Sequence, residues 1–114
     1  MSEAPAFETV VGLLDDEHAR AILAATSIEP MGSAALAERC DASRQTVYRR
    51  LDDLQDAGLV VERTRPRADG HHDAVYLATL DGLRVQLREG EYHFELDRHD
   101  PDMADELDRL WGDF

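Results

Sequence analysis

The sequence contains no lysine, a single cysteine and no long apolar run. The lone cysteine, Cys40, cannot form a disulfide within the chain, which excludes a disulfide-stabilised scaffold. No uncharged stretch exceeds eight residues, whereas a helix that spans a membrane needs about 20. The opening Met-Ser-Glu-Ala-Pro lacks the basic and apolar segments of a secretory signal. We therefore expect a cytoplasmic protein with no membrane segment.

The remaining composition is typical of a folded protein. The chain has 114 residues, of which 43% are hydrophobic and 32% are charged. This length suits one hydrophobic core, and this balance excludes a disordered tail and a collagen-like rod.

The net charge is strongly negative, at −13, because 25 acidic residues outnumber 12 arginines. This composition resembles that of cytoplasmic proteins from haloarchaea, which keep molar salt inside the cell. Carboxylates hold hydrated cations at such a surface, and salt screens their repulsion because the Debye length falls to about 3 Å at 1 M. A chain this acidic usually avoids nucleic acid, so a nucleic-acid site needs local support.

Residues 43–72 provide that local support. They contain six of the twelve arginines and carry a net charge of +1, whereas the other 84 residues carry −14. A cationic island on an anionic protein indicates a polyanion site more directly than the global charge does.

Apolar residues recur at helical spacing in the first half of the chain. This pattern predicts two short helices, or one bent helix, over 6–26, and a helix over 34–39 with Ser33 as its N-cap. Ser43 caps the next predicted helix, which runs to about residue 57. The buried stripe of that helix is predicted to be Val47, Leu51 and Leu54.

After Gly58, which is expected to end the helix, the apolar period shortens from 3.6 to 2. Segments 59–67 and 73–79 flank the turn signal Asp69-Gly70 and predict a hairpin directly behind the helices.

A second hairpin is predicted around Glu89-Gly90. If these two residues form the turn, residues whose numbers sum to 179 lie opposite each other, and Arg84 faces Glu95 while Arg88 faces Glu91. The same register places six apolar residues on the other face: Leu83, Val85, Leu87, Tyr92, Phe94 and Leu96.

Asp100-Pro101 is expected to start a C-terminal helix, since proline is favoured at the first helical position. Its apolar stripe ends in Trp111 and Phe114, which need a surface to cover them. That surface is either the first helix of the same chain or a second copy.

Several segments share the motifs of a known regulator family. They are Leu-Leu-Asp-Asp-Glu-His-Ala-Arg-Ala-Ile-Leu at 13–23, Ala-Leu-Ala-Glu-Arg at 35–39, Ser-Arg-Gln-Thr-Val-Tyr-Arg-Arg-Leu-Asp-Asp-Leu-Gln-Asp-Ala-Gly-Leu-Val at 43–60 and Val-Tyr-Leu at 75–77. Over residues 10–80 the chain thus resembles ArsR-type (arsenic-repressor-like) winged-helix regulators. The resemblance implies DNA binding, with the residues after the motif serving dimerisation.

The order of elements is also that of a winged helix-turn-helix. We expect a mainly α fold with β-hairpins, in which 1–80 form a winged helix-turn-helix DNA-binding domain. Residues 81–114 are expected to add the second hairpin and the C-terminal helix as a dimerisation extension.

The helix that starts after Ser43 carries the first group of candidate DNA contacts. At 100° per residue, Gln45 and Arg49 lie nearly opposite the buried stripe, and these residue types read adenine and guanine edges. Arg44 lies at the helix N-terminus, where the helix dipole favours phosphate. The remaining candidates suit phosphate oxygens, and they are Ser43, Thr46 and Tyr48.

The second half of this helix is predicted to turn away from DNA, because Asp52, Asp53 and Asp56 occupy its outer face. Only the N-terminal half is therefore expected to enter a major groove. Arg50 projects closer to the core, which favours a structural salt bridge.

The first hairpin carries the second group of candidates. Arg63, Arg65 and Arg67 alternate along one strand face, and His71 follows the turn. Cations on a projecting hairpin suit phosphates or a minor groove. The alternative is a solvated strand edge whose charges prevent aggregation.

Catalysis, metal binding and cofactors are not expected. No nucleophile–base pair or glycine-rich phosphate loop is present, and one thiol cannot form a tetrahedral thiolate site. The run His71-His72-Asp73 does not predict a metal site either, because adjacent strand residues point to opposite faces.

We therefore expect a homodimeric regulator of double-stranded DNA, with 43–56 in the major groove and 59–79 on the flanking backbone. Two alternatives stay open. One is a thiol- or ligand-responsive regulator that senses through Cys40, and the other is a winged-helix interaction module that does not bind DNA. Because acidic surface near DNA must take up cations, we expect affinity to depend weakly on salt.

Overall fold

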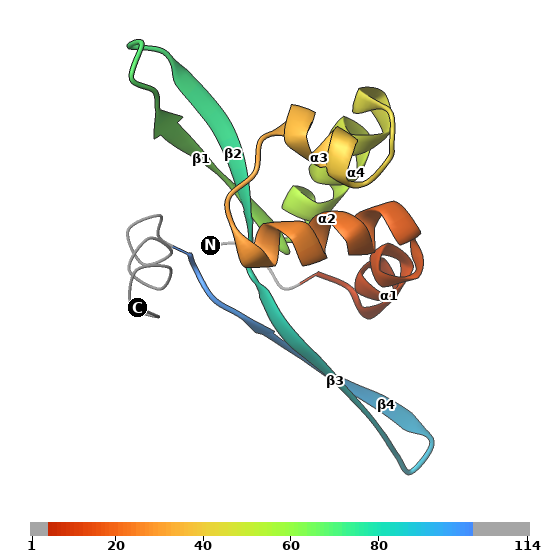
Figure 1. Cartoon of the computed structure of the whole chain (residues 1–114). Helices are drawn as coiled ribbons and strands as arrows, with labels where there is room; N and C mark the ends of the chain where they lie inside the picture. Colours follow the sequence, from red (N-terminus) through yellow and green to blue (C-terminus); the bar gives the residue numbers. More distant parts are fainter. Residues whose placement is uncertain (1–4, 102–114) are drawn as a thin grey trace.

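The computed structural model describes residues 5–101, and within them four helices precede two antiparallel hairpins (Figure 1). The helices are α1 (Phe7–Asp15), α2 (Glu17–Ile28), α3 (Ser33–Arg39) and α4 (Arg44–Asp56). The strands are β1 (Val60–Pro66), β2 (His72–Ala78), β3 (Leu80–Arg88) and β4 (Glu91–Arg98). The helices and both hairpins are thus confirmed, whereas the predicted C-terminal helix falls almost entirely outside the described residues.

Side-chain caps and a glycine set the ends of the helices. Asp16 Oδ1 accepts a hydrogen bond from Ala19 N at 2.8 Å, which separates α2 from α1. At the end of α4, Gly58 N donates to Gln55 O and has a φ of 73°, in the left-handed region where glycine is favoured. The predicted stop at Gly58 is therefore confirmed.

The predicted N-cap of α3 is wrong. The helix begins at Ser33 itself, and Gly32 occupies the cap position without a side-chain hydrogen bond. Tertiary pairing explains the shift, because Met31 and Tyr76 exchange two backbone hydrogen bonds that tie the chain to β2 just before the helix. The Ser33 hydroxyl instead donates to Tyr48 Oη at 3.0 Å.

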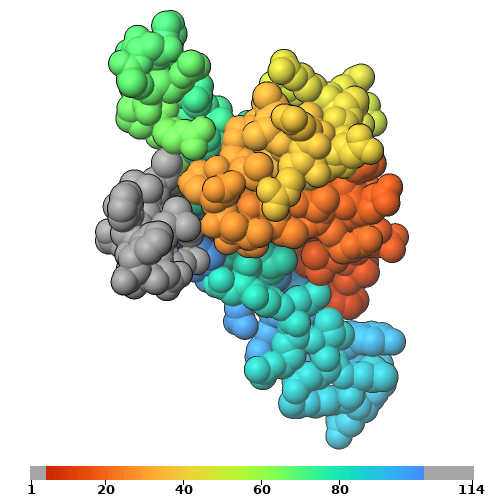
Figure 2. Space-filling model, viewed as in Figure 1, coloured from red at the N-terminus to blue at the C-terminus, as the bar shows by residue number. Residues whose placement is uncertain are grey.

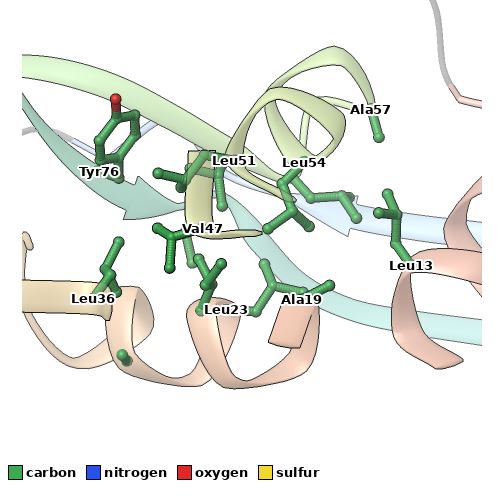
Figure 3. Packing of buried hydrophobic residues seen from close by; sticks show 14 of the residues in the cluster. Leu13, Ala19, Leu23, Leu36, Val47, Leu51, Leu54, Ala57 and Tyr76 are labelled. Atoms are coloured by element: carbon green, nitrogen blue, oxygen red, sulfur yellow. The ribbon is translucent and has the colours of Figure 1, made fainter. Parts of the chain in front are cut away.

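The helices and the base of the first hairpin enclose one hydrophobic core (Figure 3). The predicted stripe of α4 forms its centre, and Val47, Leu51 and Leu54 are at most 1% exposed. Burying each such side chain contributes about 1.5–3 kcal/mol. Partners from other elements include Leu13, Ala19, Leu23, Leu36 and Tyr76.

We call β1–β2 the wing hairpin and β3–β4 the arm hairpin. The two project in opposite directions from the helical body (Figures 1 and 2). The longest dimension of the molecule is 58 Å, and the other two are 34 and 29 Å. Only Thr79 separates β2 from β3, so the two hairpins share one nearly continuous strand path.

The predicted register of the arm hairpin is confirmed from Leu83↔Leu96 to Arg88↔Glu91. Arg84 lies 3.8 Å from Glu95, as an exposed ion pair. Arg88, by contrast, donates to Gln86 on its own strand at 2.8 Å.

The arm hairpin is anchored to the helical body by aromatic packing. The ring of Phe7 in α1 lies 6.3 Å from that of Tyr92 and 5.3 Å from that of Phe94. Towards the tip the apolar face stays open, with exposed fractions of 45% for Val85, 61% for Leu87 and 67% for Tyr92.

Candidate nucleic-acid interface

A tight turn places α3 and α4 in a helix-turn-helix arrangement. Ala42 N donates to Ala37 O at 3.0 Å, and Asp41 adopts a φ of 50° to close the turn. Ser43 Oγ then accepts a hydrogen bond from Thr46 N at 3.1 Å, so the predicted cap of α4 is confirmed.

The outer face of the first half of α4 is open. Arg44, Gln45 and Arg49 are all exposed, as the helical spacing predicts. Neither arginine forms an ion pair with another residue of the described part of the chain. Two unneutralised guanidinium groups thus lie on the first half of α4, and Arg44 lies at the positive end of its helix dipole, where a polyanion is attracted. Contact of these three side chains with DNA stays a prediction.

The other candidates on this helix are bonded within the protein. The Ser43 hydroxyl donates to Thr46 Oγ1 at 2.9 Å, and Tyr48 Oη accepts from Ser33. Tyr48 is nevertheless 49% exposed, and Ser43 is also exposed. Their expected contacts with phosphate are not tested by this geometry. Sequence reasoning missed the hydrogen bond between Ser33 and Tyr48 because it joins residues 15 positions apart.

The second half of α4 is acidic on its outer face, where Asp52, Asp53 and Asp56 are exposed. The salt bridge predicted for Arg50 is confirmed, because its Nε lies 3.0 Å from Asp16 Oδ2. This Nε is buried and forms no well-aligned hydrogen bond, so the contact is chiefly electrostatic. The Ala19 backbone N–H, with help from Arg50, holds the pKa of Asp16 below its ordinary value.

The wing arginines have carboxylate neighbours. Arg65 Nη2 lies 4.0 Å from Asp73 Oδ2, on the paired strand. Arg67 lies 3.4 Å from Asp73 and 3.2 Å from Asp69 in the turn. His71 Nδ1 lies 3.3 Å from the same Asp69. Much of the positive charge predicted for the wing tip is therefore balanced within the wing.

Arg63 is balanced from elsewhere in the sequence. Its Nη2 donates to Asp100 Oδ1 at 2.6 Å, across 37 residues of chain. The candidate arginines thus form two groups. Those on α4 have no acidic partner among the described residues, whereas those on the wing hairpin each lie near a carboxylate. Whether Arg63, Arg65, Arg67 and His71 contact DNA stays a prediction.

Cys40 closes α3 and is partly buried against the core. Burial raises the pKa of its thiol, which lowers the fraction of reactive thiolate at neutral pH. Within residues 5–101, no group of three or more histidine, cysteine or acidic side chains is placed to hold a metal ion.

Comparison with protein families agrees with this geometry. The family described as a helix-turn-helix domain matches residues 14–63, from the end of α1 through α4 into β1. Such a domain suggests DNA-binding transcription regulation, and proteins of this kind are typically not enzymes. No curated protein matches the chain significantly. Across the described range, none of the helices combines the length and hydropathy that a bilayer crossing requires.

Proposed function

We propose that this chain, whose residues 14–63 form an ArsR-type helix-turn-helix domain, is a sequence-specific DNA-binding transcription regulator that acts as a homodimer. The observation that carries the proposal is the open, cationic first half of α4. Arg44, Gln45 and Arg49 are exposed there, and neither arginine has an acidic partner among the described residues. On a protein this acidic, an exposed patch of unpaired arginines indicates a binding site for a polyanion such as DNA.

The division of charge along α4 indicates how the helix would meet DNA. Its N-terminal half enters the major groove, where Arg49 and Gln45 reach base edges. Its C-terminal half carries Asp52, Asp53 and Asp56, and repulsion tilts this end away from the phosphates. The wing hairpin then lies over the flanking backbone. There, phosphates compete with Asp73 and Asp69 for the wing arginines.

The homodimer is supported by the open apolar face of the arm hairpin. Val85, Leu87 and Tyr92 lie on one face, and Val11 of α1 is also 42% exposed. Apolar side chains gathered on a projecting hairpin favour contact with another protein surface. We assign residues 81–114 as the dimerisation extension. Two copies joined this way present two α4 helices to successive major grooves about 34 Å apart.

A second candidate function is a winged-helix interaction module that does not bind DNA. The pairing of Arg63, Arg65 and Arg67 with carboxylates favours it, because a paired arginine offers less net charge to a phosphate. Thiol sensing through Cys40 gains no such support, since its raised pKa disfavours the reactive thiolate.

Fluorescence anisotropy in molar KCl separates the two candidates. A bound duplex is first selected from random sequence, and its affinity is then measured for Arg49→Ala and Gln45→Ala. Each substitution is expected to cost about 1–3 kcal/mol, and to relax preference at one base pair of each half-site. Arg20→Ala is the matched control, because it removes an exposed arginine of α2 that lies outside both the candidate interface and residues 81–114. Failure to select any duplex favours the interaction module.

A further inference from the structure

The recognition helix α4 and the two hairpins meet at one buried residue, Thr79. Thr79 is 8% exposed and lies between β2 and β3. Its backbone N–H donates to Leu59 O at 2.8 Å, and its carbonyl accepts from His99 N at 2.9 Å. Its side-chain Oγ1 donates to Gly58 O at 2.6 Å. All of its polar groups are therefore bonded. Two of the bonds go to the connection between α4 and β1, at Gly58 and Leu59, and one goes to His99, just after β4.

Gly58 lies just after α4, so the hydrogen bond from the Thr79 hydroxyl links the segment between β2 and β3 to the end of that helix. The φ of 73° at Gly58 suits glycine, and a Cβ there would collide with the Arg98 guanidinium. Arg98, at the end of β4, also faces Gly58 O through Nη1, at a weak 3.4 Å. The Thr79 hydroxyl thus forms the shorter of the two side-chain bonds to Gly58 O.

The backbone bonds of Thr79 join three strand ends. Its N–H donates to Leu59, just before β1, and its carbonyl accepts from His99, just after β4. The hydroxyl adds a second bond to the connection between α4 and β1, at the residue nearer the helix. A valine of nearly the same shape could fill the space, so packing does not require the hydroxyl.

Small changes of angle at Thr79 have large effects at the arm tip. The arm extends for about nine residues beyond Thr79, or roughly 30 Å at 3.3 Å per residue. A rotation of about 10° at the base therefore moves the tip by about 5 Å. One base pair of duplex DNA rises about 3.4 Å, so this displacement exceeds one base-pair step.

We propose that the Thr79 hydroxyl is a positioning group that, together with the packing of Phe7 against the arm hairpin, fixes the angle between this hairpin and α4, and thereby the half-site spacing that the dimer selects. The proposal rests on the proposed function, because spacing has meaning only for a dimer that binds DNA. It adds a residue that touches no DNA yet determines specificity.

The test uses the full chain and duplexes that carry two half-sites at spacings varied in single base-pair steps around one helical turn, about 10 base pairs. The wild type and Thr79→Ser, which keeps the hydroxyl, are expected to share one sharp optimum. Thr79→Val and Thr79→Ala are expected to shift that optimum by at least one base pair, or to reduce its advantage over neighbouring spacings by at least fivefold. Ser27→Ala, which removes an exposed hydroxyl near the end of α2, is the control.

Two further measurements separate positioning from folding and from the proposed function. Affinity for a single half-site and the dimer dissociation constant are expected to stay within twofold of wild type in every folded variant. Dipolar spectroscopy on labels at Asp56→Cys and Glu89→Cys, in a Cys40→Ser background, measures the helix-to-tip distance without DNA. Its distribution is expected to broaden or shift in Thr79→Val.

An unchanged spacing optimum and an unchanged distance distribution in Thr79→Val would overturn the positioning role. Should the wild type bind no DNA at all, the proposed function fails, and the label distances alone then decide whether Thr79 fixes the angle. Should Thr79→Val not fold, the smaller Thr79→Ala carries the same expectations.

Discussion

Removing one carboxylate, by Asp73→Asn, makes the wing hairpin more basic without changing its shape. Asp73 lies opposite Arg65 in the strand pairing and contacts both Arg65 and Arg67. Arg67 keeps Asp69 as a partner at 3.2 Å, so the substitution chiefly releases Arg65. The released guanidinium becomes available to a DNA phosphate on each protomer.

The slope of affinity against salt measures this release. Each phosphate neutralised contributes about −0.9 to the slope of log K against log salt concentration. If only Arg44 of each protomer neutralises a phosphate, a dimer has a slope of about −1.8 before cation uptake by its acidic surface. Freeing Arg65 in both protomers steepens the slope by about 1.8. Between 0.5 and 2 M KCl, the ratio of variant to wild-type affinity then falls by about 12-fold.

The assay is anisotropy titration of one labelled operator duplex at four KCl concentrations in that range. Glu17→Gln is the matched control, because this substitution removes the same charge from an exposed residue at the start of α2, outside the wing hairpin. Thermal melts at each salt concentration verify that both variants are folded. A constant affinity ratio for Asp73→Asn, or an equal steepening in Glu17→Gln, refutes the reasoning that the wing arginines are held from DNA by their own carboxylates.

Three further predictions concern stability and reactivity. Asp16→Ala is expected to cost about 1 kcal/mol at pH 7 through loss of the helix cap. Because the pKa of Asp16 is lowered in the folded state, this contribution is present above the unfolded value of about 3.9. The contribution disappears as pH falls through the lower pKa of the folded state, so the stabilities of wild type and Asp16→Ala from urea melts should converge in acid. A difference that stays constant with pH would contradict this. Gly58→Ala is expected to lower the free energy of unfolding by about 1–2 kcal/mol because φ is positive at this position. Displacement of Arg98 by the new Cβ adds to the loss, and an unchanged Tm would count against the prediction. Cys40 is expected to react with a chromogenic disulfide more slowly than free cysteine at pH 8, since burial raises its pKa, and equal rates would restore the thiol-sensor alternative.

Local signals explain most of what could be predicted about the fold. The cap at Ser43 and the stop at Gly58 bound α4 because side-chain caps and left-handed glycines act within a few residues. The arm register could be derived from Glu89-Gly90 because a two-residue turn leaves one pairing that keeps all apolar residues on one face. The same reasoning does not extend to the wing. There, Arg67 N donates to His71 O, so the loop holds three residues and Arg65 faces Asp73.

Contacts between distant segments could not be read from spacing. Ser33 misses its expected cap because Met31 pairs with β2, and Arg63 finds Asp100 only after the arm hairpin has returned the chain to the wing. Such pairings depend on where the elements pack, which sequence periodicity does not encode.

The sequence by itself determined which residues form helices and strands, and which face of α4 stays open, because capping, glycine conformation and apolar period are local properties. Only the tertiary structure decided the charge balance of the candidate interface. It left Arg44 and Arg49 without acidic partners among the described residues, and it brought Asp73 and Asp100 onto the wing arginines. The physical reason is that a salt bridge depends on distance in space, which the β1–β2 register sets for Asp73 and the return of β4 to the wing sets for Asp100.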